Sequence, residues 1–280
     1  MCGGGMSLPQ IPPILLVGCG KMGGAMLRSW QERGLSRSFV VSPSPRALGE
    51  SVTVVPDVTK IPADFRPAAV ILAVKPQVAP SILPDYARFA GHSVFLSVMA
   101  GLTQAGLAGI LGEQAAIVRS MPNTPSAIGK GFTMAHAGPH VDAAQRSLCH
   151  TLLEAVGTVA WAEQETELLA ATAISGGGPA YVFLMAELLE RCALEQGLEP
   201  DLARSMARQT VIGAASLLER EEADAAVLRR AVTSPGGTTE QALKILMAED
   251  ALPSAFSRAV KAAIRRAGEL SGAPVVEPVR

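Results

Sequence analysis

A glycine-rich turn near the N-terminus constrains the fold of this chain more than any other feature. An apolar run at residues 14–17 is followed by Gly18, Gly20 and Gly23, which spell G-x-G-x-x-G directly before a segment with helical periodicity. The first glycine permits a tight turn, the second lets backbone N–H groups reach a diphosphate, and the third lets helix and strand pack closely. The helix N-terminus adds partial positive charge. The pattern predicts a strand, turn and helix that bind the diphosphate of a nicotinamide dinucleotide.

The residues after the second apolar run indicate which dinucleotide is bound. NAD enzymes place an Asp or Glu about 20 residues beyond the glycine turn to accept hydrogen bonds from the ribose. This chain has no acid there and instead has Ser42, Ser44 and Arg46. Hydroxyls and a guanidinium can donate to a 2′-phosphate, which a carboxylate would repel. We therefore expect NADP, with NADPH preferred and NADH an alternative. An ordinary Ser/Pro loop with a solvated Arg46 is the structural alternative.

The first 160 residues alternate apolar runs with helical patterns, which is typical of a doubly wound α/β sheet. Six runs rich in Val and Ile predict strands that are buried on both faces. These runs are ILLVG, FVVS, VTVV, AAVILAV, SVFLSV and AAIVRSM. Helices are predicted at 21–33, 76–89 and 103–111. A hairpin-like strand pair, 131–137 and 158–162, is expected to bracket a helix near 141–156.

Ligands of such sheets bind at the carboxyl ends of the strands, so residues directly after each run are site candidates. Each of these segments fits a structural loop as well as a site, and their convergence favours a site. The candidates are Ala73, Val74, Lys75 and Pro76 after the fourth run, Ala100 and Gly101 after the fifth, and Asn123 after the sixth. The glycine turn and the second strand complete the predicted cofactor site with Gly18, Gly20, Lys21, Met22, Gly23, Ser42, Ser44 and Arg46.

The second half of the chain has a different character, because strand-like runs give way to successive helical patterns. We expect a flexible leader at 1–13, a Rossmann-type dinucleotide-binding domain at 14–164 and an all-α domain at 165–280. These helices are very apolar, so part of their surface is expected to pack against a second subunit. A self-contained bundle is the alternative.

Two glycine-rich turns are predicted to interrupt these helices. The segment SGGGP at 175–179 is expected to break one helix, and Ser234 to Thr239 joins two others. In the second turn, Gly236 and Gly237 would expose backbone N–H groups beside a helix that begins near Thr238. Such a turn suits an anion. A plain helix linker is the structural alternative.

Composition excludes several classes of function. The net charge is −1 with 18% charged residues, so the sequence indicates neither a basic surface for nucleic acid nor a polybasic membrane patch. The four cysteines show no metal-ligand or disulfide spacing, so we expect no metal and a reducing cytoplasm. No run of about 18 uninterrupted apolar residues occurs, which favours a soluble protein. The four histidines are expected in loops or on a polar helix face, and no hydrolase or kinase motif is present.

Several motifs together resemble the pyrroline-5-carboxylate reductase family. They are GCGKMG, LAVKPQ, MPNTP, SGGGPAYVF and, most diagnostic, LRRAVTSPGGTTEQAL, and the similarity spans residues 14 to about 270. The resemblance implies a Rossmann-type domain followed by an all-α dimerisation domain, in a homodimer or a larger homo-oligomer built from dimers. It also implies hydride transfer from NAD(P)H to the imine carbon of 1-pyrroline-5-carboxylate, giving L-proline.

The resemblance also assigns roles within the second motif. Ser234, Gly236 and Gly237 would hold the substrate carboxylate. Thr239 would hydrogen-bond the ring nitrogen as an orienting group, with Thr238 beside it. The chain departs from the family at Gly177, where Ser is common, and at Ala231, where relatives offer a polar group, so side-chain roles at these two positions do not carry over.

Three alternatives stay open at this point. A β-hydroxyacid dehydrogenase of the same architecture normally needs a lysine early in the second domain, and no lysine occurs between Lys130 and Lys244. An imine reductase could act on a different ring. A non-catalytic NADP-sensing dimer is the third alternative, and it would not need a carboxylate-binding turn at 234–239.

Overall fold

The computed structural model describes residues 11–44 and 47–272. Contacts within the chain divide it into two compact units. The sheet unit comprises residues 1–176 and 263–280, and the helical unit comprises residues 177–262. The compact division after Gly176 falls later than the change in composition expected at residue 165.

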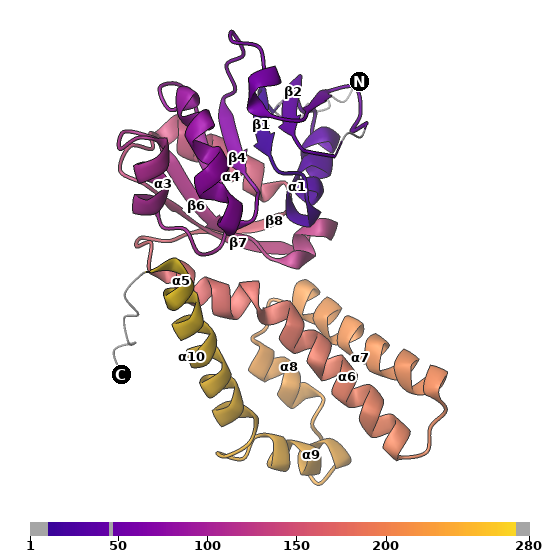
Figure 1. The fold of residues 1–280 in the computed structure, drawn as a ribbon. Coiled ribbons are helices and arrows are strands. Elements are labelled where there is room, and N and C mark those ends of the chain that lie inside the picture. The colour runs from indigo at the N-terminus through magenta and orange to yellow at the C-terminus, as the bar shows by residue number, and fades with distance from the viewer. Residues whose placement is uncertain (1–10, 45–46, 273–280) are drawn as a thin grey trace, which may run out of the picture. The chain divides into compact units, whose positions relative to one another are not determined.

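The described part of the sheet unit contains one eight-stranded sheet with the order β3-β2-β1-β4-β5-β6-β7-β8 (Figure 1). Strands β1 to β6 are parallel, and β7 is antiparallel to β6. The strands are β1 (Ile14–Val17), β2 (Ser38–Val41), β3 (Val52–Val55), β4 (Ala69–Leu72), β5 (Val94–Ser97), β6 (Ile117–Met121), β7 (Gly131–Ala137) and β8 (Gly157–Trp161). The order 3-2-1-4-5-6 is that of a doubly wound sheet, which confirms the predicted fold class.

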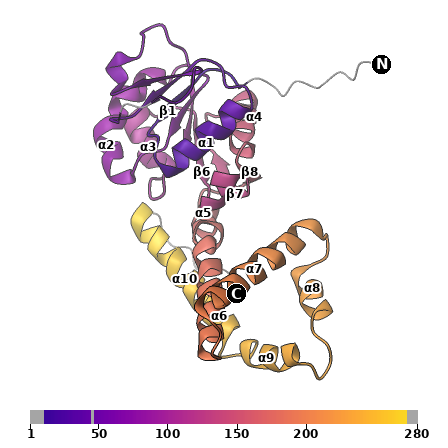
Figure 2. The same ribbon diagram turned by 90° about the vertical axis from the view of Figure 1, so that its right-hand side faces the viewer.

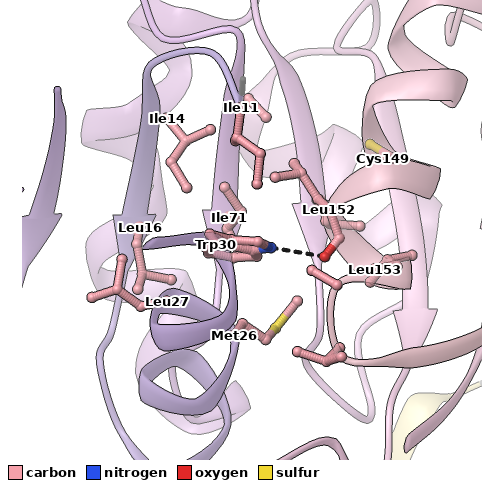
Figure 3. Packing of buried hydrophobic residues seen from close by; sticks show 14 of the residues in the cluster. Ile11, Ile14, Leu16, Met26, Leu27, Trp30, Ile71, Cys149, Leu152 and Leu153 are labelled. Carbon is pink, nitrogen blue, oxygen red and sulfur yellow. Dashed lines mark hydrogen bonds between the residues drawn. The ribbon is translucent and has the colours of Figure 1, made fainter. Parts of the chain in front are cut away.

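Helices cover both faces of this sheet, because β1, β4 and β5 are buried throughout and are apolar except for Ser97. On one face lie α1 (Lys21–Glu32) and α4 (Ala143–Glu154), whose buried side chains share one core with the strands. Figure 3 shows the hydrogen bond that joins these helices, from Trp30 Nε1 to the Leu152 carbonyl oxygen at 2.7 Å. A second core on the opposite face includes η3 (Leu83–Phe89) and α3 (Gln104–Leu111).

Two details around β7 differ from the sequence prediction. Strands β7 and β8 pair in parallel, so the expected hairpin-like pair is wrong. The reason is that α4 connects them, and a crossover of this length returns the chain in the same direction. His136 lies within β7, opposite Arg119 of β6, and not in a loop or on a helix.

The helix predicted at 76–89 is broken into short pieces. A 3₁₀ turn, η2 (Pro76–Val78), leads into one turn of α-helix, α2 (Ala79–Ile82), and then into the 3₁₀ segment η3. Each piece begins with proline at its first or second position. Proline cannot donate the hydrogen bond that would continue the preceding turn, so a regular α-helix does not form here.

The expected break at SGGGP is also wrong. Helix α5 (Glu167–Ala171) continues through a π-helical turn, η5 (Thr172–Gly176), into α6 (Gly178–Glu195). Gly177 keeps right-handed helical angles, and proline is tolerated because it stands in the first turn of α6. The stretch 167–195 is therefore long and apolar enough to cross a membrane, judged by length and composition only, and 17% of its most apolar window is buried.

The helical unit contains α6, α7 (Pro200–Arg220), α8 (Ala225–Ala231), α9 (Thr238–Leu246) and the first part of α10 (Leu252–Ser271). Helices α6 and α7 pack side by side, while α8 and α9 follow one another away from that pair (Figure 2). Among the described residues of this unit, the buried side chains are those of Ala203 and Ala207 alone. The unit thus lacks a core of its own, which disfavours a self-contained bundle.

Candidate functional site

The glycine turn lies at the point where the strand order reverses, between β1 and β4. The Gly18 N–H donates to the Val41 carbonyl oxygen at 3.0 Å, and the Ala73 N–H donates to the Val17 carbonyl oxygen at 2.8 Å. Gly18 has a φ of 89°, and a Cβ there would lie 2.7 Å from the Ala73 carbonyl oxygen. Gly23 is equally restricted, because its Cβ would collide with the Gly18 carbonyl oxygen. The predicted strand, tight turn and helix are thus confirmed.

Gly20 differs from these two glycines, because no atom of the described chain lies within 4 Å of a Cβ built on it. Its φ of −75° is also open to other residues. Packing therefore does not explain the glycine at this position. No described side chain caps the N-terminus of α1, so its first backbone N–H groups are left for a ligand. An open backbone beside a free helix N-terminus fits the diphosphate of a dinucleotide.

A cavity of about 640 Å³ opens at the carboxyl ends of β1 to β4. A volume of this size suits a ligand such as the adenosine half of a dinucleotide. Of the predicted cofactor residues, the cavity brings together Gly18, Gly20, Ser42, Ser44, Ala73, Val74 and Lys75. Apolar side chains, among them Val58, Val78 and Ile82, complete the wall. The structure therefore places seven predicted residues around one space, while their cofactor contacts stay predictions.

The two serines after β2 have different surroundings. Ser42 is buried, and its Oγ lies 3.4 Å from the Ser44 N–H, which donates to it. Ser44 itself is exposed at the mouth of the cavity. Arg46 lies outside the described residues. Ser42 therefore shapes the turn that presents Ser44.

The other predicted residues of the glycine turn face a second space. Lys21 and Met22 line a cavity of about 940 Å³ with Gly20 and the outer face of α1. Pro76 begins η2 directly after Lys75 and sets the direction of the chain there. Gly20 borders both cavities, so the N-terminus of α1 separates them.

Sequence reasoning missed two acidic residues in the first cavity, Asp57 after β3 and Asp85 in η3. Hydrogen bonds from the Thr59 side chain and backbone hold the pKa of Asp57 below its ordinary value, so its carboxylate is ionised. Burial raises the pKa of Tyr86, which also lines the cavity, and the negative charges of Asp85 and Asp57 raise it further. The sequence shows that Asp57 follows the third apolar run, but only the strand order shows that it lies beside the end of β2.

The candidates after β5 and β6 have structural partners. Gly101 has a φ of 82°, and a Cβ there would lie 3.3 Å from the Leu270 carbonyl oxygen. The Asn123 side chain donates to the Ser175 carbonyl oxygen at 3.0 Å and accepts from the Phe132 N–H at 2.9 Å. Ala100 is exposed beside Gly101. Asn123 thus ties β7 to η5, and cofactor contacts at these three positions stay predictions.

The second motif lies in the helical unit, between α8 and α9. Gly236 has a φ of 70°, and the Gly237 N–H closes the turn on the Ser234 carbonyl oxygen at 3.0 Å. Ser234, Thr238 and Thr239 are exposed, and α9 begins at Thr238 as predicted.

This turn already binds an anion of its own chain. The Gly236 N–H donates to Oε2 of Glu240 at 3.0 Å, and Lys244 Nζ lies 3.5 Å from the same oxygen. Glu240 is the third residue of α9, a position from which acidic side chains reach back to free N–H groups. The turn can therefore hold a carboxylate, as its backbone geometry predicts.

Comparison with known proteins connects both motifs to one family. Residues 165–270 match the family model described as pyrroline-5-carboxylate reductase dimerisation, and residues 13–101 match that described as NADP oxidoreductase coenzyme F420-dependent. A pyrroline-5-carboxylate reductase of Pseudomonas aeruginosa is 33% identical over 93% of this chain and 97% of its own length. The chain belongs to the pyrroline-5-carboxylate reductase family. The enzyme of the same name from Haemophilus influenzae is 30% identical over 92% of this chain and 97% of its own length.

Solved structures of this family share the fold. A pyrroline-5-carboxylate reductase from Coxiella burnetii superposes with a TM-score of 0.83 at 33% identity, covering 92% of this chain and 98% of that one. The Plasmodium falciparum pyrroline carboxylate reductase, solved with NADP bound, gives a TM-score of 0.79 at 25% identity, covering 92% of this chain and 99% of that one. The pyrroline-5-carboxylate reductase fold thus extends over both units of this chain.

Proposed function

We propose that this protein is a pyrroline-5-carboxylate reductase that uses NADPH to reduce 1-pyrroline-5-carboxylate to L-proline, the last step of proline biosynthesis. The observation that carries the proposal is Gly20, whose open surroundings at the uncapped end of α1 are explained by a dinucleotide and not by packing. Relatives named pyrroline-5-carboxylate reductase align over nearly the whole chain, which supports 1-pyrroline-5-carboxylate as the substrate.

The sheet unit binds the cofactor. Backbone N–H groups at the start of α1 hold the diphosphate, and Gly18 keeps β1 and β4 close enough to form the turn. Ser42, Ser44 and Arg46 act on the 2′-phosphate side, and Lys75 contributes positive charge at the end of β4. Bound NADPH supplies the hydride.

The turn between α8 and α9 binds the substrate. Ser234, Gly236 and Gly237 hold its carboxylate, while the Thr239 hydroxyl hydrogen-bonds the ring nitrogen and Thr238 lies beside it. A pyrroline imine is basic enough to be protonated near neutral pH, so the hydride adds to the imine carbon and leaves a secondary amine. The site therefore needs positioning more than a strong acid, in accord with the absence of a histidine from both motifs.

The protein acts as a homodimer or a larger homo-oligomer built from dimers. The helical unit exposes large apolar side chains that an isolated chain would leave in water. Among them, Phe183 is 67% exposed, Ile212 52% and Leu184 51%. A second copy covers this surface, and the match to a dimerisation family supports this arrangement. A reducing cytoplasm is the location we propose, since the cysteines of the sequence have no metal-ligand or disulfide spacing.

The experiment compares substrates at equal enzyme concentration. Addition of 1-pyrroline-5-carboxylate to purified protein and NADPH should reduce the nicotinamide absorbance, whereas β-hydroxyacids with NADP should give no change. Faster turnover of a different cyclic imine would make the protein an imine reductase of the same architecture. NADPH binding without turnover of any of these compounds would favour an NADP-sensing dimer.

A further inference from the structure

Asp57 lies next to the segment that is expected to select the cofactor. Strands β2 and β3 pair in parallel with Val41 opposite Val55, and the Ser42 N–H donates to the Val55 carbonyl oxygen at 3.0 Å. Asp57 follows Val55 by two residues and lines the same cavity as Ser42 and Ser44. The strand order thus supplies a carboxylate where the residues after β2 supply none.

The carboxylate of Asp57 is fixed and charged. Its Oδ1 accepts from the Thr59 N–H at 2.9 Å and from the Thr59 hydroxyl, which makes Asp57 the N-cap of the 3₁₀ turn η1 (Val58–Lys60). These bonds hold the pKa of Asp57 below its ordinary value. Both of these hydrogen bonds reach Oδ1, and Asp57 is exposed, so its carboxylate can also accept a hydrogen bond from a ligand.

The described lining of this cavity carries two carboxylates, Asp57 and Asp85, and one ammonium group, Lys75. A 2′-phosphate carries close to two negative charges, so a neighbouring carboxylate opposes it. A ribose 2′-hydroxyl would instead donate to that carboxylate, as it does to the acid of NAD-dependent enzymes. The two cofactors therefore respond to Asp57 in opposite directions.

We propose that Asp57 is a specificity-determining residue that reduces the preference for NADPH and allows NADH to serve as a second reductant. Asp57 opposes the 2′-phosphate that Ser44 favours, and it accepts a hydrogen bond from the ribose of NADH. This inference rests on the proposed function only in that the cavity binds a nicotinamide dinucleotide.

The test is Asp57→Asn, with binding of NADPH and NADH measured by fluorescence titration of the full-length protein. Asparagine is as good an N-cap as aspartate and keeps its size, so the variant should fold like the wild type. We expect NADPH to bind more tightly and NADH more weakly, so that the ratio of the two Kd values changes by about tenfold. Asp64→Asn, which removes an exposed acid that does not line the cavity, should leave the ratio unchanged.

Salt provides a second readout. Repulsion between Asp57 and a phosphate at the cavity mouth is screened by ions, so the tighter binding of NADPH to Asp57→Asn should diminish as ionic strength rises. An unchanged Kd ratio in Asp57→Asn would overturn the inference, as would an equal change in Asp64→Asn. If the wild type binds neither cofactor, the proposed function fails first, and this outcome is distinct from the other two.

Discussion

Gly18 and Ala73 meet so closely at the switch point that a Cβ on Gly18 would lie 2.7 Å from the Ala73 carbonyl oxygen. The ends of β1 and β4 approach each other so closely here that no side chain fits at position 18. Gly20, two residues further on, has no such neighbour in the described chain. Packing of the fold therefore requires glycine at position 18, whereas we infer that the bound cofactor requires glycine at position 20.

Gly18→Ala and Gly20→Ala should separate these reasons. Gly18→Ala combines a collision with a positive φ, so we expect it to lower the free energy of unfolding by about 1–3 kcal/mol. Gly20→Ala should change that free energy by less than about 0.5 kcal/mol. It should nevertheless raise the Kd for NADPH at least about tenfold, because the methyl group occupies the space of the diphosphate. Chemical denaturation and NADPH titration measure both quantities.

Gly109→Ala is the matched control for this pair. Gly109 lies in α3, away from both cavities, and its Cβ would also meet no described atom within 4 Å. Alanine should leave NADPH binding unchanged and stabilise the helix slightly. If Gly20→Ala also binds NADPH like the wild type, the diphosphate does not approach Gly20 and the site is wrongly placed.

Thr239→Ala should reduce turnover much more than cofactor binding. The hydroxyl orients the substrate ring, so we expect kcat to fall on the order of 100-fold while the Kd for NADPH stays within about twofold. Thr239→Ser keeps the hydroxyl and should recover most of the activity. Thr210→Ala, on the exposed surface of α7, serves as the control. Equal losses in turnover and NADPH binding would show that Thr239 acts on the cofactor or on the fold.

Glu240 should compete with the substrate for the turn at 234–237. Its carboxylate accepts the hydrogen bond of the Gly236 N–H, which the substrate carboxylate is proposed to use. Glu240→Gln removes the like charge, so KM for 1-pyrroline-5-carboxylate should fall about threefold with kcat nearly unchanged. Glu249→Gln, another exposed acid, should leave KM as it is. A KM that stays constant or rises in Glu240→Gln would reduce Glu240 to a helix cap.

Phe183→Asp should disrupt assembly without affecting cofactor binding. Phe183 is 67% exposed on α6, and a charge there would oppose burial against a second copy. Analytical ultracentrifugation should show a shift toward monomers, while the NADPH titration stays like that of the wild type. Glu222→Lys changes a charge in the exposed α7–α8 connection and should leave assembly intact. An unchanged oligomer in Phe183→Asp would mean that α6 does not lie at the interface.

The sequence predicts the sheet well, because short apolar runs and the glycine turn are local signals. The six runs became β1 to β6, and the turn formed at Gly18 to Gly23. Two features of the sheet unit that were not predicted depend on long-range arrangement. The parallel pairing of β7 with β8 and the position of Asp57 beside Ser42 follow from strand order, which no local pattern contains.

The helical half shows the opposite limitation. Glycine and proline in SGGGP predict a break, yet Gly177 keeps helical angles and the chain continues through a π-turn. The apolar helix surface was predicted correctly, but an isolated pattern cannot tell a bundle core from a surface that a partner covers. The exposed fractions of Phe183, Leu184 and Ile212 show that these side chains do not form a bundle core within this chain.

We propose that this protein transfers a hydride from NADPH to the imine carbon of 1-pyrroline-5-carboxylate. The most direct test uses NADPH deuterated at the transferred position of the nicotinamide and detects proline by mass spectrometry. We predict one deuterium in each L-proline formed, at the former imine carbon, and no product without the cyclic imine. Proline without deuterium, or oxidation of NADPH without any proline, would contradict this hydride transfer.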